Sequence, residues 1–383
     1  MIAISVWIYE RTGSALAVGG SLAVRQLPAA VMGWVGGVLS DRYDRRRVII
    51  GGIIMKAAAA LCLLVLGDRA LFSVILLVSA LSSGGESLTM PARSATVPMV
   101  VEKEGVLRAN SILYSTDNFV TMVGALAGGM LTSIWGIYRL CAANIACLGI
   151  SAVLVACIRF RGSLQTGISQ ASRPRLSVSL RDGTTYLRDH APAMLLIAVY
   201  ASWTIGVGMS NVAIVVLPQT TFRSGAAGVG VLYAAVCGGA FLGSFASKPV
   251  LRRIPLSRSI PLVIAVCGMA DIALGSCRML WQGAALIFAA GLMDGILTVS
   301  TETSLMDTVP VGLLGRVFGV RTGLAMLSAM AGTLAGGIIN DRFSSAACMQ
   351  AAGLIMIGAS MIALWQRKRI GELDVTRGVQ ELK

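Results

Sequence analysis

Long apolar segments alternate with short polar ones along almost the whole chain. A helix needs about 20 apolar residues to cross a membrane, because the hydrocarbon core is about 30 Å thick. The first apolar segment, residues 1–9, is too short to cross alone. The pattern predicts eleven complete spans at residues 15–39, 48–66, 70–90, 109–133, 140–158, 193–217, 229–247, 259–277, 280–303, 317–339 and 346–365.

The composition agrees with this pattern. Hydrophobic residues make up 56% of the chain and charged residues only 13%, and the mean hydropathy is +0.78. Soluble domains carry about 25% charged residues, and a soluble globule of this composition would expose more apolar surface than folded monomers tolerate. The sequence therefore predicts an all-α integral membrane protein. It excludes a disordered chain, a disulfide scaffold and a collagen-like repeat.

Basic residues are distributed unevenly between the polar connectors. The net charge is +14, and alternate connectors form two series, one with 24 lysines and arginines (Arg321 among them) and one with six. Cytoplasmic loops carry the basic excess in membrane proteins, so the charge indicates topology rather than a nucleic-acid partner. We expect Arg173, Lys368 and the C-terminus to be cytoplasmic, and Arg139 and Arg342 to be external, in a cell inner membrane.

The two halves of the chain share short sequences in the same order. Thr-Val-Pro at 96–98 recurs at 308–310, and Leu-Ala-Gly-Gly at 126–129 recurs at 334–337. Parallel repeats of this kind are typical of secondary transporters built from two six-helix bundles. The longest polar connector separates the halves, which predicts a bundle over 1–158, a cytoplasmic inter-bundle loop over 159–190, a second bundle over 191–366 and a cytoplasmic tail over 367–383.

The sharpest local motif follows the first complete span. It contains G-x-x-x-D-R followed by a run of arginines, and it resembles motif A of the major facilitator superfamily. The resemblance implies a conformational latch formed by Gly37, Asp41, Arg42, Arg45 and Arg46. The glycine permits close helix approach, and the carboxylate of Asp41 accepts charge-assisted bonds from arginines and helix-end amides. The alternative is that the arginines only set the topology.

A second motif narrows the resemblance to a group of exporters. The sequence PARSATVP at 91–98, followed by RANS at 108–111, resembles the loop after the fourth helix in the third drug:proton antiporter group, which includes macrolide and enterobactin exporters. The resemblance extends over residues 4–365 and implies the major facilitator fold, alternating access, and proton-driven export of a small amphipathic molecule of the drug or siderophore type. One departure is Ala125, where motif C of that group has a proline.

The resemblance also bears on the start of the chain. Residues 7–14 are similar to the outer end of the first helix and the turn after it. The inner half of that helix is absent, so we expect about 10–25 further apolar residues to be encoded upstream of Met1. Without them, the chain has eleven full spans and an incomplete first helix. A truncated membrane protein that does not transport is therefore one alternative, and uptake by proton symport is another.

Several ionisable residues lie inside the predicted spans, where charge is costly and faces a cavity or a partner. A carboxyl group can change its protonation with its surroundings, so the candidates for proton coupling are Asp294, Asp271, Asp117, Glu86 and Glu302. Arg25 and Lys56 are candidates for binding an anionic substrate, or else fixed partners of the acids. Asp294 ranks first because Gly291 and Gly295 flank it, which would let water approach.

Small residues inside the spans are predicted to serve packing. The pairs Gly124/Gly128 and Gly332/Gly336 have the GxxxG spacing, which lets helices approach closely. The eight cysteines fall almost wholly inside apolar segments and include no CxxC pair, so we expect packing rather than metal binding. The chain also lacks a phosphate-binding P-loop, HExxH and GxSxG. We expect no catalytic site, cofactor or metal, and a monomer whose partners are the lipid bilayer, protons and a small-molecule substrate.

Overall fold

The structure is a computed structural model that describes residues 2–42, 45–66, 72–100, 106–157, 185–309 and 314–368. Nearly all of these residues are helical, and no strand occurs among them. In chain order the helices are α1 (Ile2–Thr12), α2 (Ala15–Arg42), α3 (Arg45–Leu66), α4 (Phe72–Val100), α5 (Val106–Cys157), α7 (Ala191–Thr220), α8 (Gly225–Arg253), α9 (Leu256–Leu274), α10 (Leu280–Thr308), α11 (Leu314–Arg342) and α12 (Ser345–Trp365). The predicted all-α architecture is confirmed.

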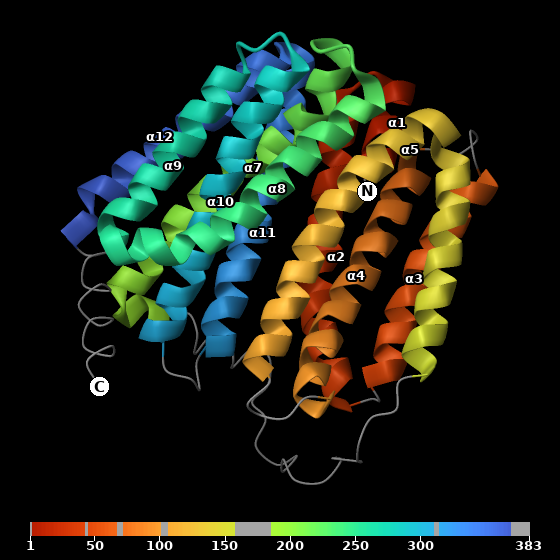
Figure 1. Cartoon of the computed structure of the whole chain (residues 1–383), viewed down its shortest axis with the longest axis horizontal. Helices are drawn as coiled ribbons and strands as arrows, with labels where there is room; N and C mark the ends of the chain where they lie inside the picture. The colour runs from red at the N-terminus through yellow and green to blue at the C-terminus, as the bar shows by residue number, and fades with distance from the viewer. Residues whose placement is uncertain are drawn as a thin grey trace.

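The helices form two groups that stand side by side (Figure 1). In the first group, α1 to α5, helix α4 packs on both α2 and α3. In the second, α7 to α12, helix α8 packs on α10, α9 on α12 and α7 on α11. The groups meet along α2–α11 and along α5–α8. The limits of the predicted loop at 159–190 and tail at 367–383 lie mostly outside the described residues, so these domain boundaries stay predictions.

Most of the predicted spans correspond to helices that suit a membrane. Eight helices in the described ranges are long and apolar enough to cross one: Arg46–Leu66, Tyr138–Cys157, Ala191–Thr220, Gly225–Ser247, Leu256–Leu274, Leu280–Glu302, Val317–Arg342 and Ser345–Trp365. The three other predicted spans, 15–39, 70–90 and 109–133, correspond to α2, α4 and the first arm of α5. In each of these, part of the side chains lies outside the described residues.

Helix α5 contains two of the predicted spans. Its 52 residues form two helical arms joined at Gly136, which has a φ of 72°. Glycine reaches this left-handed conformation without the strain that a Cβ would cause. The chain therefore turns over at a single residue, and the arms run in opposite directions (Figure 1).

Helix α4 is longer than the sequence predicts. The sequence places residues 91–98 in a loop, but the helical backbone continues to Val100. That loop prediction is wrong. A helix of 29 residues is about 43 Å long at 1.5 Å per residue, whereas the hydrocarbon core is about 30 Å thick. The last turns therefore extend into the interface, where water can satisfy the backbone groups that prolines leave unpaired.

Glycine contacts set the spacing in the second group. Gly332 and Gly336 of α11 face the backbone of α7 so closely that a Cβ on either would collide with it. This pair is confirmed as a packing face. For Gly124 and Gly128, no atom of the described residues lies within 4 Å of a Cβ built on either glycine, so packing by this pair stays a prediction.

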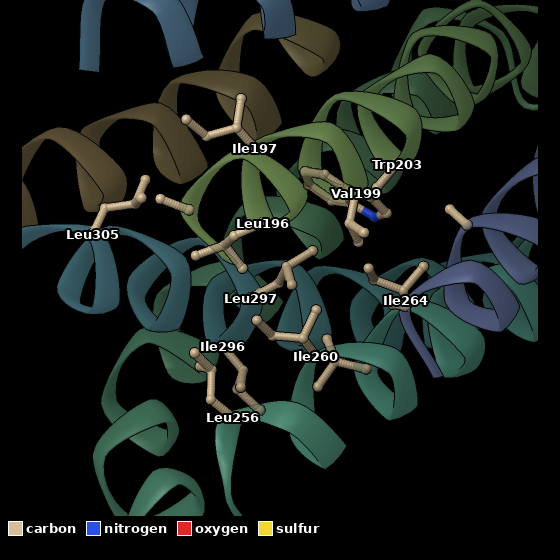
Figure 2. Packing of buried hydrophobic residues seen from close by; sticks show 14 of the residues in the cluster. Leu196, Ile197, Val199, Trp203, Leu256, Ile260, Ile264, Ile296, Leu297 and Leu305 are labelled. Atoms are coloured by element: carbon tan, nitrogen blue, oxygen red, sulfur yellow. The ribbon is translucent and has the colours of Figure 1, made fainter. Parts of the chain in front are cut away.

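Branched side chains fill the interior of the second group (Figure 2). Leu196 and Trp203 of α7, Ile260 and Ile264 of α9, and Leu297 of α10 are at most 4% exposed and belong to one apolar cluster. This packing fixes the positions of α7, α9 and α10 relative to one another. Of the predicted acids in this half, Asp271 lies on α9, and Asp294 and Glu302 lie on α10.

Candidate functional site

The residues of the predicted motif A latch lie at the end of α2 and the start of α3. Helix α2 ends at Arg42 and α3 begins at Arg45. The side chains of Gly37, Asp41, Arg42 and Arg45 lie outside the described residues, and that of Arg46 is half-buried at the start of α3. The latch therefore stays a prediction.

Two candidates of opposite charge pair with each other in the first group of helices. Nζ of Lys56 on α3 lies 2.9 Å from Oε2 of Glu86 on α4. The two helices approach closely here because Gly52 faces Gly85 across the contact. The side chain of Glu86 is 59% exposed and that of Lys56 is 25% exposed. The structure thus joins a proton-coupling candidate and an anion-binding candidate in one partly exposed salt bridge.

Arg25 lies where the two groups of helices meet. It is half-buried on α2, and its backbone carbonyl accepts a hydrogen bond of 2.6 Å from the hydroxyl of Ser83 on α4. It lies near Tyr233 of α8 and Glu86 of α4. Because α8 belongs to the second group, Arg25 has neighbours in both halves.

Asp271 is the most deeply buried of the five predicted acids. It is 4% exposed on α9, and the hydroxyl of Ser210 on α7 donates a hydrogen bond of 2.6 Å to its Oδ2. One turn earlier, Gly268 packs directly against Gly353 of α12. Asp271 therefore lies inside a tightly packed junction of α7, α9 and α12.

Asp294 has a more open setting on α10. Its side chain is half-buried, and the hydroxyl of Thr298 in the next turn donates to its Oδ1 over 3.2 Å. Its charge acts on Tyr200 of α7 and on Cys237 of α8. Asp294 therefore lies on the side of α10 that these two helices share.

The glycines beside Asp294 do not have the role that the sequence suggests. A Cβ on Gly291 or Gly295 would collide with backbone carbonyl groups of α8. They let α10 pack on α8, and they leave no room there for water. The reason for ranking Asp294 first is therefore corrected, because the space beside both glycines is filled by another helix.

Asp117 is the remaining acid of the first group. It is half-buried on the first arm of α5, and the hydroxyl of Thr121 donates a hydrogen bond of 2.6 Å to its backbone carbonyl. Helix α5 borders α8, whereas Asp271 and Asp294 lie within the second group. In the described part of the chain, no three acid, histidine or cysteine side chains gather in a way that would hold a metal.

Glu302 pairs with an arginine that the sequence assigns to a cytoplasmic connector. Nη1 of Arg321 lies 3.1 Å from Oε1 of Glu302. Arg321 belongs to α11, its side chain is only 7% exposed, and its guanidinium carbon lies 4.1 Å from the ring centroid of Tyr200. The connector assignment is wrong, because α11 begins at Leu314 and carries Arg321 into the helical bundle. The sequence already indicated a helical position for Arg321, because this residue lies inside the predicted span 317–339.

A second site that the sequence did not reveal joins the two groups at one end. The carboxylate of Asp341, at the end of α11, accepts hydrogen bonds from the hydroxyl of Ser14 (2.6 Å) and from the backbone N–H groups of Ala15 (2.6 Å) and Leu16 (3.0 Å). A carboxylate at a helix N-terminus satisfies unpaired N–H groups and favours the helix dipole. Asp341 therefore caps α2, a helix of the other group.

The contact between α2 and α11 continues below this cap. A Cβ on Gly19 would collide with the carbonyl of Thr333, and one on Gly337 would lie against Leu16. Because these atoms are backbone, the two helices touch with no side chain between them. The cap and the glycines together form what we call the α2–α11 contact.

An apolar groove flanks this contact without reaching the charged residues. It has a volume of about 530 Å³ and lies between α2, α4 and α11, with Leu27, Leu76 and Leu334 among its lining residues. None of the acids or bases proposed for coupling or binding lines it. The groove is therefore separate from the polar groups described above.

Comparison with known proteins decides the family. The family model described as Major Facilitator Superfamily matches residues 1–280. The chain belongs to this superfamily. It is a multi-pass membrane transport protein rather than an enzyme.

Relatives of this superfamily member include proteins named as exporters. It is 26% identical to enterobactin exporter EntS of Salmonella typhi over 397 aligned residues, which cover 97% of this chain and 88% of the relative. It is also 26% identical to macrolide efflux protein A of Streptococcus pyogenes over 200 residues, 52% of this chain. That match spans about half the length of the relative, 49%.

A solved transporter shares the fold of this superfamily member. The nucleoside transporter NupG aligns with a TM-score of 0.70, covering 97% of this chain and 94% of that chain, at 12% sequence identity. At such low identity the likeness concerns the fold alone. It confirms the major facilitator architecture that the motifs imply.

Proposed function

We propose that this superfamily member is a proton-coupled exporter of a small amphipathic molecule and works by alternating access. Two relatives are named for efflux or export, one of a macrolide and one of enterobactin, which supports the direction and the substrate class. The proposal places it as a monomer in the cell inner membrane, with the C-terminus cytoplasmic. Its partners are protons and the exported molecule.

The observation that carries this proposal is the pairing of two membrane-embedded acids with hydroxyl groups. Asp271 receives its hydrogen bond from Ser210 and Asp294 from Thr298, and neither acid has a basic side chain at salt-bridge distance among the described residues. A hydroxyl donates to a carboxylate and accepts from a protonated carboxyl, so the hydrogen bond survives a change of protonation. If the partner were an arginine, protonation of the carboxylate would leave the arginine without its charged acceptor.

A proton gradient drives transport only if some group carries a different charge in the inward-facing and outward-facing states. Asp294 fits this role better than Asp271, because it is half-buried near α7 and α8 while Asp271 is enclosed by packed helices. The ion pair of Glu86 with Lys56 and that of Glu302 with Arg321 make these acids second choices. Asp294 therefore remains the first candidate, now for its setting rather than for its glycines.

The α2–α11 contact supports the alternating-access part of the proposal. Transporters of this architecture move their halves against each other around a central site, so contacts between the halves at one end must form and break. Asp341 is suited to this because its hydrogen-bond partners are three groups at one helix end. These groups can bind water when the contact opens.

The test is efflux of enterobactin or of a macrolide from proteoliposomes under an imposed pH gradient. Wild type is compared with Asp294→Asn, Asp271→Asn and Asp117→Asn. We expect Asp294→Asn to keep substrate exchange without a gradient while losing the response to the gradient. Substrate exchange serves as the control for folding and insertion in each variant.

Each other outcome contradicts a defined part of the proposal. If all three variants keep proton-driven efflux, the carboxylate mechanism is wrong. If substrate moves in the same direction as protons, the protein is an uptake symporter. If neither compound moves across the membrane in either direction with the wild type, export of these two classes is wrong.

A further inference from the structure

Arg321 is a buried charge at a junction of three helices. Its own helix, α11, packs mainly on α7 and α2, whereas α10 packs mainly on α8 and α9. The ion pair with Glu302 nevertheless connects α11 to α10, and the ring of Tyr200 on α7 covers a face of the guanidinium at 4.1 Å. A second aromatic ring, that of Phe318, lies 5.9 Å away.

The hydrogen bonds of this guanidinium are incomplete. Nη1 donates to Glu302, but Nε and Nη2 are buried and have no hydrogen-bond partner among the described residues. Buried donors without acceptors are costly, and more so when they carry charge. Nε and Nη2 form one edge of the planar group, with the spacing that binds both oxygens of a carboxylate. The edge thus lacks a bidentate acceptor.

The surroundings indicate what kind of acceptor fits. The Glu302 side chain is 37% exposed while that of Arg321 is 7% exposed, so the ion pair has an accessible end and a buried end. Aromatic rings next to the guanidinium favour a flat apolar body attached to the anionic group. The other bases fit less well, because Lys56 already holds Glu86 and Arg25 lies near the same acid.

We infer that Arg321 binds the anionic group of the transported molecule, in a site completed by Tyr200 and reached past Glu302. The inference rests on the proposed transport function and deepens it, since it makes the substrate class an aromatic or otherwise flat organic anion of carboxylate type. Glu302 is the internal competitor, because its carboxylate holds Nη1 and its negative charge opposes a second carboxylate on the same guanidinium. Substrate entry then weakens the link between α10 and α11, which ties binding to helix movement.

The experiment measures equilibrium binding of radiolabelled benzoate to the purified full chain in nanodiscs, without any gradient. Benzamide has nearly the same shape without the charge and serves as the unlabelled competitor control. We expect saturable benzoate binding that excess benzoate displaces and benzamide does not. If benzamide competes as well as benzoate, the site does not recognise an anion and the inference is overturned.

Three variants assign the binding to the proposed residues. Arg321→Gln should weaken benzoate binding at least about tenfold through loss of charge-assisted hydrogen bonds. Arg321→Lys, which keeps the charge but not the two-pronged edge, should weaken it less. Glu302→Gln should strengthen it, because the internal competitor loses its charge. The matched control is Arg278→Gln, an exposed arginine in a connector, which should bind as wild type does.

A purely structural ion pair would give a different pattern. Glu302→Gln would then leave benzoate binding unchanged or lower, in parallel with a lower Tm, and this result would overturn the inference even if Arg321→Gln failed to fold. The proposed function fails separately: benzoate binding as expected without gradient-driven efflux contradicts proton coupling alone. Efflux as expected with unchanged binding in Arg321→Gln contradicts the anion site alone.

Discussion

Asp271, Glu86 and Glu302 all lie in predicted spans but differ in what their side chains meet. Glu86 forms a partly exposed salt bridge with Lys56. Glu302 holds a buried arginine, whose charge would be uncompensated without it. Asp271 meets only a hydroxyl among its described partners. At the residue scale, the partner therefore separates acids that form ion pairs from an acid that meets only a hydroxyl.

The hydrogen bond between Ser210 and Asp271 can be tested by removing the hydroxyl. Ser210→Ala leaves a buried carboxyl group without its donor, so we expect the free energy of unfolding to fall by about 1–3 kcal/mol, seen as a lower Tm in detergent. The matched control is Ser202→Ala on the same helix, whose hydroxyl donates only to the carbonyl of Ala198. Equal losses of Tm in the two variants would show that the contact with Asp271 adds nothing.

The motif A latch can be tested at Asp41. Asp41→Asn keeps the size of the side chain but removes the charge that strengthens hydrogen bonds to arginines and helix ends. We expect a reduced transport rate with near-normal abundance in the membrane, since the substitution shifts the conformational equilibrium rather than folding. An unchanged transport rate would mean that the arginines there act only as topology signals.

At the scale of helices, the halves are joined by two different kinds of contact. Along α5–α8 the packing includes the sulfur of Met122 close to Gly238, and a flexible side chain of this kind adapts to movement. The α2–α11 contact instead brings backbone against backbone at Gly19 and Thr333. Such a contact has no side chain that could adapt to movement, so a small displacement or an added Cβ already breaks the close packing. It therefore suits a switch between two discrete positions.

Gly19→Ala tests the switch, and Gly20→Ala is its matched control. A Cβ at position 19 would collide with the carbonyl of Thr333, whereas no atom of the described residues lies within 4 Å of one at position 20. Overpacking of this kind costs about 1–3 kcal/mol, so Gly19→Ala should separate the ends of α2 and α11. Spin labels at Glu10 and Phe343, both exposed, would report a larger population at long distance in a cysteine-free background.

Asp341→Asn is expected to act in the same direction as Gly19→Ala, because the cap of α2 loses its charge. Gly20→Ala should leave the distance distribution as in the wild type. If Gly19→Ala and Gly20→Ala give identical distributions, the backbone contact does not hold the two helices together.

At the scale of the whole molecule, two groups of helices stand side by side (Figure 1). Two such groups agree with the sequence repeat and with the superfamily to which the chain belongs. The turn at Gly136 and the α2–α11 contact lie at the same end of the groups, since Trp7 and Val18 share an apolar cluster with Cys141. The basic connectors predict that this end is external.

Labelling of single cysteines would test that orientation. In a cysteine-free background, residues 173 and 368 should react only with reagents that reach the cytoplasm, and residues 139 and 342 with a membrane-impermeant reagent added outside. The basic residues are concentrated in the first series of connectors, and this asymmetry orients insertion. External labelling at position 173 would contradict the two-bundle topology.

Apolar segment length, an internal repeat and two motifs determined the membrane class, the number of bundles and the superfamily. These are local quantities, because each helix must by itself bury about 20 apolar residues in the bilayer. The candidate acids also followed from the sequence, since charge inside an apolar segment is visible without any fold. The helix ends were less accurate, as at Val100, because the sequence does not show where a helix leaves the membrane.

Only the tertiary structure decided which groups the charged side chains contact. Asp271 and Ser210 are 61 residues apart, Lys56 and Glu86 are 30 apart, and Asp341 and Ala15 are 326 apart. Such partners depend on how each helix is rotated about its axis, and many rotations bury the same apolar area. The glycine contacts select one rotation, because two helix backbones can approach closely only at the glycines. That selection buries Arg321 beside Tyr200 and leaves one edge of its guanidinium without an acceptor from the described part of the chain.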